Sequence, residues 1–113
     1  MRRGEIHIVD LNPTIGSETN KKRPVLIISN DINNLYSDTI TIIPITSNTN
    51  KIYPFEVLLK SNQKNGLTKD SKVQCHQIRT VSKTRISGNV LGTVLEYELN
   101  QIEEALKLHL ELE

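Results

Sequence analysis

The chain is poor in the residues that would point to a disulfide scaffold or a membrane protein. Cys75 is the one cysteine among 113 residues, so an intramolecular disulfide is excluded. No apolar run approaches the roughly 20 residues that a membrane-spanning helix needs. Residues 1–5 lead into an alternating stretch and not into the apolar core of a signal peptide. We therefore expect a cytoplasmic protein without a membrane partner.

Motifs for metals, nucleotides and covalent catalysis are missing as well. The chain has no Gly-rich phosphate loop, no His-Glu-x-x-His helix, no paired-cysteine zinc site and no Gly-x-Ser-x-Gly elbow. Its three histidines, at positions 7, 76 and 109, are too scattered to suggest a metal cluster. We therefore expect a function that needs neither a metal ion nor a cofactor.

The charge is unevenly distributed along the chain, although the net charge is only +1. Residues 96–113 contain six acidic residues and one basic residue, Lys107, so the first 95 residues hold 13 Lys and Arg against 7 Asp and Glu. A basic body is compatible with a phosphate-bearing partner, and an acidic terminal segment is equally typical of a solvated helix. The length fits a single domain over residues 1–113.

Short β-branched runs separated by turn signals occupy the first 91 residues. They predict strands at residues 5–10, 24–29, 39–45, 55–59, 71–77 and 85–91, with a turn or a single helical turn at 31–37. Pro44 is expected at a bulge or a strand end, Gly88 at a bulge, and Asn65-Gly66 in a turn.

The hydrophobic period changes near residue 93. Thr93 and Glu96 match a Thr-x-x-Glu capping box, and apolar residues follow at helical spacing at Leu95, Leu99, Ile102 and Leu106. Short strands followed by one helix predict a mostly β fold with α structure (α+β). In this fold a strongly bent sheet or small barrel carries a C-terminal amphipathic helix.

Polar residues stand at the ends of two apolar strands. Arg23 immediately precedes the run Pro24–Ser29, and Thr46 and Ser47 immediately follow Thr39–Ile45. If these strands pair antiparallel, Arg23 and Thr46 emerge at the same rim. A guanidinium beside a hydroxyl suits a phosphate, because the first neutralises charge and the second donates a hydrogen bond. The same residues also fit a surface ion pair and an ordinary turn.

The order and spacing of several motifs resemble those of the MazF/PemK family of toxin endoribonucleases. The motifs extend over almost the whole chain and comprise Gly4-Glu5-Ile6, Asp10-Leu11-Asn12-Pro13, Gly16-Ser17-Glu18, Arg23-Pro24-Val25-Leu26-Ile27-Ile28-Ser29-Asn30-Asp31, Pro44-Ile45-Thr46-Ser47 and Gln77-Ile78-Arg79-Thr80. No single motif is decisive, but their combination is hard to obtain by chance.

The resemblance implies an SH3-like barrel with a terminal helix, in a protein that forms homodimers. It further implies the toxin of a type II toxin–antitoxin system, an endoribonuclease that cuts single-stranded RNA at short sequences without a metal. In this family the ribose 2′-OH attacks the adjacent phosphate and leaves a 2′,3′-cyclic phosphate and a 5′-OH. The expected partners are therefore single-stranded RNA and a cognate antitoxin protein.

Carried over to this chain, the catalytic arginine and threonine of the family fall on Arg23 and Thr46. Because a guanidinium stays protonated, Arg23 suits stabilisation of the phosphorane and protonation of the leaving oxygen, and Thr46 suits a hydrogen bond to a phosphate oxygen. The loop over residues 14–22 is a candidate gate. The expected RNA-binding residues are Gly16, Ser17, Glu18, Lys22, Ser47, Gln77 and Arg79, the last of which could instead tie its loop to the barrel.

The chain departs from the PemK branch of the family at one place. That branch carries an Arg and an Asp, proposed as acid and base, where this chain has Gln74 and His76. His76 is a candidate catalytic base because histidine titrates near about 6.5, and it equally fits a half-exposed strand residue. The departure favours the Arg–Thr scheme of the MazF branch.

Two other functions are compatible with the same fold. CcdB proteins share it and inhibit DNA gyrase, but they depend on a C-terminal Trp-Gly-Ile, whereas this chain ends with Leu110–Glu113 and has no Trp. A non-catalytic binding module would need an aromatic peptide groove, for which one Phe and three Tyr are poor material. The ribonuclease interpretation is therefore preferred.

Overall fold

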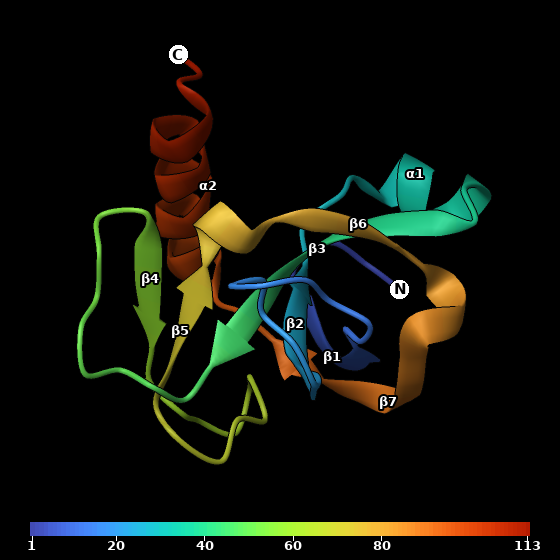
Figure 1. Ribbon diagram of the computed structural model, residues 1–113, viewed down its shortest axis with the longest axis horizontal. Coiled ribbons are helices and arrows are strands. Elements are labelled where there is room, and N and C mark those ends of the chain that lie inside the picture. The colour runs from blue at the N-terminus through green and yellow to red at the C-terminus, as the bar shows by residue number, and fades with distance from the viewer.

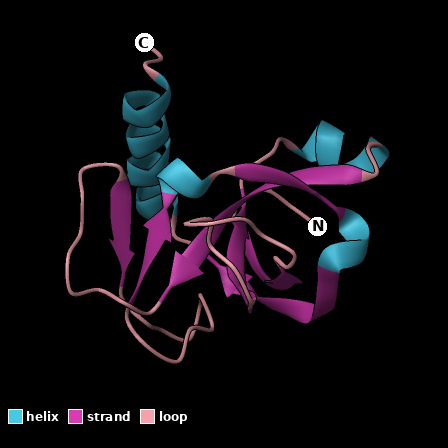
Figure 2. Ribbon diagram, in the orientation of Figure 1, coloured by secondary structure: helices cyan, strands magenta, loops and turns pink.

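Seven short antiparallel strands form one bent sheet that a C-terminal helix covers at one end (Figures 1 and 2). The computed structural model describes residues 1–113, and the strand order is β4-β5-β3-β2-β1-β7, with β6 pairing β3. The strands are β1 (Glu5–Asp10), β2 (Lys22–Ile27), β3 (Thr39–Thr46), β4 (Glu56–Leu59), β5 (Ser71–Gln74), β6 (Arg79–Ser82) and β7 (Ile86–Thr93). The helical segments are α1 (Asp31–Tyr36), η1 (Cys75–Gln77), η2 (Lys83–Arg85) and α2 (Glu96–Leu110).

The mostly β fold with a C-terminal helix is confirmed, but the sheet does not close into a barrel. Strands β4 and β7 are the two ends of the pairing order and do not pair with each other. None of the helices is long and apolar enough to cross a membrane.

The edge of β3 opposite β2 is shared by two strands, β5 and β6, where the sequence predicted one continuous strand over 71–77. Ile45 and Thr46 pair with β5, while residues 39–42 pair with β6. The segment that connects β5 to β6 is longer than the stretch of β3 between the two pairings, so it forms the turn η1. The predicted strand over 71–77 is therefore wrong at 75–77, and β6 was missed. Ile43 and Pro44 have no partner on that edge, so the proline removes no ladder hydrogen bond there.

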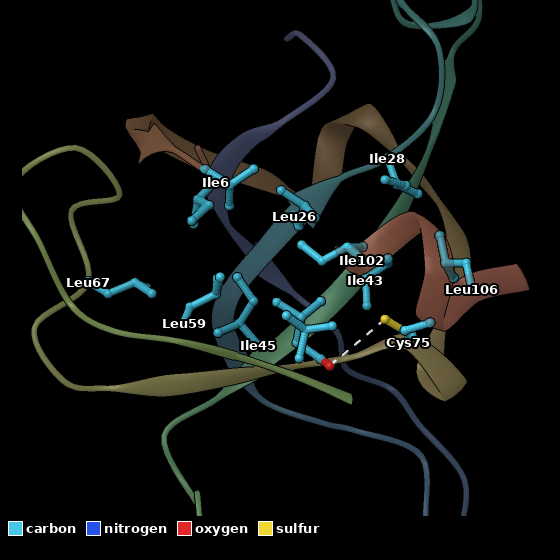
Figure 3. Packing of buried hydrophobic residues seen from close by; sticks show 14 residues of the cluster. Ile6, Leu26, Ile28, Ile43, Ile45, Leu59, Leu67, Cys75, Ile102 and Leu106 are labelled. Atoms are coloured by element: carbon cyan, nitrogen blue, oxygen red, sulfur yellow. Dashed lines mark hydrogen bonds between the residues drawn. The ribbon is translucent and has the colours of Figure 1, made fainter. Parts of the chain in front are cut away.

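The central strands bury side chains on both faces, as their continuous apolar runs require. One cluster of 14 buried residues includes Ile6, Leu26 and Ile43 and packs beneath α2 through Ile102 and Leu106 (Figure 3). A second cluster of seven residues, among them Val25, lies on the opposite face. His7 points to the face opposite that of the buried Ile6. Because this second face is covered as well, His7 is only 6% exposed.

The helix α2 begins two residues later than the predicted capping box. Thr93 is still paired with Glu5 as the last residue of β7, and Leu95 is the N-cap. The Glu98 carboxylate accepts a hydrogen bond from the Leu95 N–H at 2.8 Å, which satisfies one of the free donors at the helix start. The helix ends at Leu110, after which Glu111 adopts a left-handed conformation with φ 55°.

The loop between β4 and β5 is clamped against β7. A Cβ atom on Gly66 would lie 2.2 Å from the Leu91 carbonyl oxygen, and Gly66 has φ +69°, so only glycine fits this turn. The predicted Asn65-Gly66 turn is confirmed. The register of β7 against β1 shifts between Ile6 and Ile8, and Gly88, with φ +75°, lies in the irregular stretch, as predicted.

Candidate functional site

Antiparallel pairing of β2 and β3 brings Arg23 and Thr46 to the same rim, as the sequence predicted. Val25 pairs with Pro44, so the start of β2 lies beside the end of β3. Arg23, Thr46 and Ser47 line one cavity of about 560 Å³. We refer to it as the Arg23–Thr46 cavity. Its apolar wall consists of Ile8, Pro24, Ile45, Leu67 and Leu91.

The Arg23 guanidinium has no carboxylate partner. Its Nε donates a hydrogen bond to the Asn20 carbonyl oxygen at 2.6 Å, and the four ion pairs of the structure all involve other residues. Partial burial lowers the pKa of Arg23 below its ordinary value. A guanidinium nevertheless remains protonated at neutral pH. Both terminal nitrogens are therefore free, and the fully charged guanidinium can bind an anion through them.

Hydroxyl groups surround this cation. The Thr46 Oγ1 accepts a hydrogen bond from the Asn48 N–H at 3.3 Å, which leaves its own O–H free to donate. Ser47 is exposed at the rim, and the loop between β4 and β5 contributes Thr68 and the exposed Lys69. Two cations and several hydroxyls without a facing carboxylate favour a phosphate over a cationic or neutral ligand.

The cavity also contains Lys69 and Thr68, to which no sequence motif pointed. They lie in a loop with only turn signals, and the pairing of β3 with β5 brings that loop to Arg23. A loop lysine is indistinguishable from an ordinary solvated residue until the register of these strands is known. No local signal could have identified either residue.

The predicted gate loop is tied to η1 through glutamine side chains. The Gln77 Oε1 accepts from the Thr19 N–H at 3.2 Å, and its Nε2 donates to the Ser17 carbonyl oxygen at 3.5 Å. The Thr19 hydroxyl donates to the Gln74 Oε1 at 3.0 Å. Gly16, Ser17 and Glu18 are exposed in this loop, and the Glu18 carboxylate accepts from the Ile15 N–H at 2.6 Å. None of these residues lines the Arg23–Thr46 cavity.

The structure does not bring His76 to the Arg23–Thr46 cavity. His76 lies in η1, where its ring packs against Phe55 at 4.6 Å and lies 6.4 Å from the His109 ring. Burial, with smaller contributions from His109 and Lys72, lowers the pKa of His76, although Glu56 acts in the opposite direction. Its neighbourhood is therefore a packed aromatic cluster, and His76 does not line the Arg23–Thr46 cavity.

The Arg23–Thr46 cavity is not lined by Arg79, Lys22 or Cys75. The Arg79 Nη1 donates to the Leu11 carbonyl oxygen at 3.4 Å, which ties β6 to the end of β1. Lys22 is exposed and lines a separate, smaller cavity. Cys75 is fully buried, and desolvation, with the nearby Glu56 carboxylate, raises the pKa of its thiol to about 12. Because its thiol stays protonated at neutral pH, Cys75 cannot act as a nucleophile. Its burial makes it a core residue.

A larger cavity lies elsewhere and is less suited to RNA. A groove of about 820 Å³ separates β4 from α2 and is lined by Glu56, Glu98 and Glu104 with Lys60 as its one cation. Two of these carboxylates are already paired, Glu56 with Lys72 and Glu104 with Lys107, so the groove offers only Lys60 to a phosphate backbone. No group of three or more His, Cys, Asp and Glu side chains is arranged to hold a metal ion anywhere in the structure.

Comparison with known proteins agrees with this geometry. Residues 2–110 match the model of a family described as PemK-like, MazF-like toxin of type II toxin–antitoxin system. The chain belongs to this family. It is 48% identical over 117 residues to endoribonuclease MazF9 of Mycobacterium tuberculosis, covering 99% of this chain and 98% of that protein. It is 36% identical to endoribonuclease EndoA of Bacillus subtilis, covering 99% of this chain and 96% of the relative.

Solved structures of MazF-like proteins show the same fold. A mycobacterial endoribonuclease in complex with its cognate antitoxin superposes with a TM-score of 0.80 at 26% identity, covering 100% of this chain and 97% of the other. MazF from Deinococcus radiodurans gives a TM-score of 0.85 at 22% identity, with coverages of 98% and 96%. The family predicted from the motifs is confirmed, the comparisons support an endoribonuclease, and gyrase inhibition is not favoured.

Proposed function

We propose that this toxin-family member cleaves single-stranded RNA at the Arg23–Thr46 cavity, without a metal ion. The observation that carries the proposal is the unpaired Arg23 guanidinium beside the Thr46 hydroxyl in one cavity. RNA phosphate is the anion that best matches a fork of N–H donors beside an O–H donor. The relatives named endoribonucleases support the same class of substrate.

The proposed reaction is a transesterification followed by release of two ends. The ribose 2′-oxygen forms a bond to the adjacent phosphorus and gives up its proton to water, and the bond from phosphorus to the 5′-oxygen breaks. The 5′-oxygen takes a proton and leaves as a hydroxyl, while the other end keeps a 2′,3′-cyclic phosphate. Negative charge builds up on the phosphoryl oxygens between these steps, and preorganised donors lower its energy.

Each residue of the cavity has a role that fits its chemistry. The free Nη groups of Arg23 bind the phosphoryl oxygens and stabilise the phosphorane, and the lowered pKa makes Arg23 a better proton donor to the leaving oxygen. Thr46 and Ser47 donate hydrogen bonds to the same phosphate. Lys69 attracts the RNA backbone. His76 has no role in this scheme because it faces Phe55 and His109.

The proposal includes the partners expected of the family. Relatives have been solved with a cognate antitoxin, and we assign an antitoxin to this chain too. We also assign a homodimer, which the exposed Leu108, Leu110 and Leu112 at the end of α2 support as apolar material for a protein contact. The cytoplasm, where messenger RNA is found, is the location that this activity requires.

The test is cleavage of a mixed-sequence single-stranded RNA by purified protein in EDTA, with the new ends characterised chemically. Arg23→Ala should lower the rate by about 10²- to 10³-fold, the usual loss for one transition-state donor. Arg23→Lys keeps the charge and loses the planar fork, so we expect it to be nearly as impaired. Arg2→Ala is the matched control, because its exposed side chain has no hydrogen-bond or ion-pair partner.

Cuts with 2′,3′-cyclic phosphates that disappear in Arg23→Ala but persist in Arg2→Ala would support the proposal. Cuts that are abolished by EDTA, or that are equally fast in Arg23→Ala, would contradict it. Melting temperatures of the variants show whether a lost activity is a lost fold. The Arg23 side chain makes one hydrogen bond, so we expect Arg23→Ala to fold.

A further inference from the structure

A buried ion pair lies beside Thr46. Lys72 on β5 is the cross-strand partner of Thr46 at the end of β3. Residues directly opposite each other in an antiparallel pair share one face of the sheet, with their Cβ atoms about 4.5–5.5 Å apart. The Lys72 Nζ lies 3.1 Å from the Glu56 Oε1, and the two side chains are only 11% and 2% exposed. The candidate catalytic threonine therefore has a buried charge pair as its neighbour.

Stability alone does not account for this ion pair. Lys72 is the one buried lysine of the chain. Apolar residues of similar volume are often at least as stable as a buried ion pair, because taking two charges out of water costs about as much as their attraction returns. The bonds of an ion pair are directed, however, so they can hold a neighbouring segment in one conformation.

The segment held by this pair is the loop that leads out of β3. The loop covers residues 47–55, joins β3 to β4 and passes outside β4 (Figure 1). The Lys72 Nζ donates a hydrogen bond to the Lys51 carbonyl oxygen at 2.6 Å. The Glu56 Oε1 accepts a hydrogen bond from the Tyr53 N–H at 3.0 Å. The ion pair thus binds the loop backbone at two points.

Hydrogen bonds continue from the anchored part of the loop to the Thr46 hydroxyl. The Asn50 N–H, next to Lys51 in the chain, donates to the Asn48 Oδ1 at 3.3 Å. The Asn48 N–H in turn donates to the Thr46 Oγ1 at 3.3 Å. Both bonds are longer than the usual N–H···O distance, so they depend on a fixed loop backbone. The orientation of the Thr46 hydroxyl is therefore linked to Lys72 through the loop.

We infer that Lys72 is a positioning residue for the proposed reaction: its ammonium anchors the loop over residues 47–55 and thereby fixes the Thr46 hydroxyl in the Arg23–Thr46 cavity. This inference rests on the proposed function. Lys72 does not line the cavity, so it acts through Thr46 and not by contact with the RNA. Donors that are fixed before the reaction stabilise the transition state without a cost of reorganisation.

The test removes the ammonium without leaving a buried charge unpaired. The double variant Lys72→Met/Glu56→Gln loses both charges, and the amide oxygen introduced at position 56 can still accept from the Tyr53 N–H. Lys72→Met alone would leave a buried carboxylate without its cation and would destabilise the fold. The matched control is Lys107→Met/Glu104→Gln, the same chemical change at an exposed ion pair on α2. Melting temperatures identify an assay temperature at which all variants are folded.

Cleavage kinetics in EDTA are measured on one RNA that the unmodified protein cuts. We expect kcat of Lys72→Met/Glu56→Gln to be about tenfold lower, with KM changed less than about twofold. A loosened donor lowers stabilisation of the transition state and leaves binding of the RNA intact. The control pair should keep both constants within about twofold of the unmodified protein.

Thr46→Val shows whether Lys72 acts through the threonine. Valine has a similar shape without the hydroxyl, so no donor remains to be positioned. When it is combined with Thr46→Val, the change Lys72→Met/Glu56→Gln should lower kcat by less than about twofold, because residues that act as a unit have non-additive effects. A general loosening of the fold would instead lower kcat about tenfold in both backgrounds.

Amide hydrogen exchange measures the anchoring without RNA. The N–H groups of Asn48 and Asn50 make the two hydrogen bonds that link the anchor to Thr46. Their exchange, followed by NMR, should be about tenfold faster in Lys72→Met/Glu56→Gln than in the control pair, because local opening of the loop becomes easier. Equal exchange rates in the two pairs would overturn the inference.

The outcomes separate this inference from the proposed function. If the unmodified protein cuts RNA in EDTA but kcat is unchanged in Lys72→Met/Glu56→Gln, the positioning role is overturned and the function stands. The same holds if kcat falls by an equal factor with and without the Thr46 hydroxyl. If the unmodified protein cuts no RNA, the proposed function itself fails, and the positioning role fails with it.

Discussion

Asn65→Ala tests whether one buried side chain holds the loop that completes the Arg23–Thr46 cavity. Asn65 is fully buried, and its Oδ1 accepts hydrogen bonds from the N–H groups of Asn62 at 3.1 Å and Leu67 at 3.0 Å. Its Nδ2 donates to the Lys60 carbonyl oxygen at 2.9 Å. One amide thus closes the loop whose next residues contribute Thr68 and Lys69 to the cavity.

Alanine would leave two backbone N–H groups and one carbonyl without these partners. At about 1 kcal/mol for each net hydrogen bond, the expected destabilisation is about 3 kcal/mol. For a chain of this size the melting temperature should fall by on the order of 10 °C. Displacement of the loop should also lower RNA cleavage by about tenfold or more at a temperature where the variant is folded.

Thermal unfolding followed by circular dichroism gives the first quantity, and initial cleavage rates give the second. Asn89→Ala is the control, because Asn89 is exposed on β7 and its side chain makes no hydrogen bond. A melting temperature equal to that of the control would refute the account of the clamp. A large loss of stability with full cleavage activity would refute the link between this loop and the cavity.

Two further predictions concern the core and the aromatic cluster. Ile102→Ala, at a fully buried position of α2, should lower the free energy of unfolding by about 2–5 kcal/mol in urea titrations, whereas Leu35→Ala, 70% exposed on α1, should change it little. The lowered pKa of His76 means that the unfolded chain binds its proton more tightly than the folded one. Stability from this residue is therefore complete above about pH 6.5 and is lost as the pH falls below that value, so His76→Asn should flatten the stability profile between about pH 5 and 7. An unchanged profile would mean that His76 titrates alike in both states.

Much of the fold follows from local chemistry. The runs Pro24–Ser29 and Thr39–Ile45 are rich in β-branched residues and contain no charged residue, and such runs form strands that are largely buried on both faces. Asn65-Gly66 and Gly88 mark the turn and the irregular pairing because their backbone conformations suit few other residues. The position of Arg23 before one strand and Thr46 after the next was sufficient to place both at one rim.

The predictions from sequence were wrong where long-range strand pairing overrides the local hydrophobic pattern. Residues 75–77 read as the continuation of a strand, but β5 and β6 must both fit along β3, and the surplus chain forms η1. That turn directs His76 towards Phe55 and away from Arg23, which no periodicity reveals. The capping box at Thr93 failed because Thr93 pairs with Glu5, a contact made by the first strand of the chain.

The sequence by itself determined the family, the strand-rich architecture with its closing helix, and the pair Arg23 and Thr46. These depend on residue types at short spacing, which control local conformation and the ends of adjacent strands. Only the tertiary structure decided that the sheet stays open and that Lys69 joins Arg23 in one cavity. Those arrangements depend on which distant segments pair and in what register, and register is set by packing the whole chain at once.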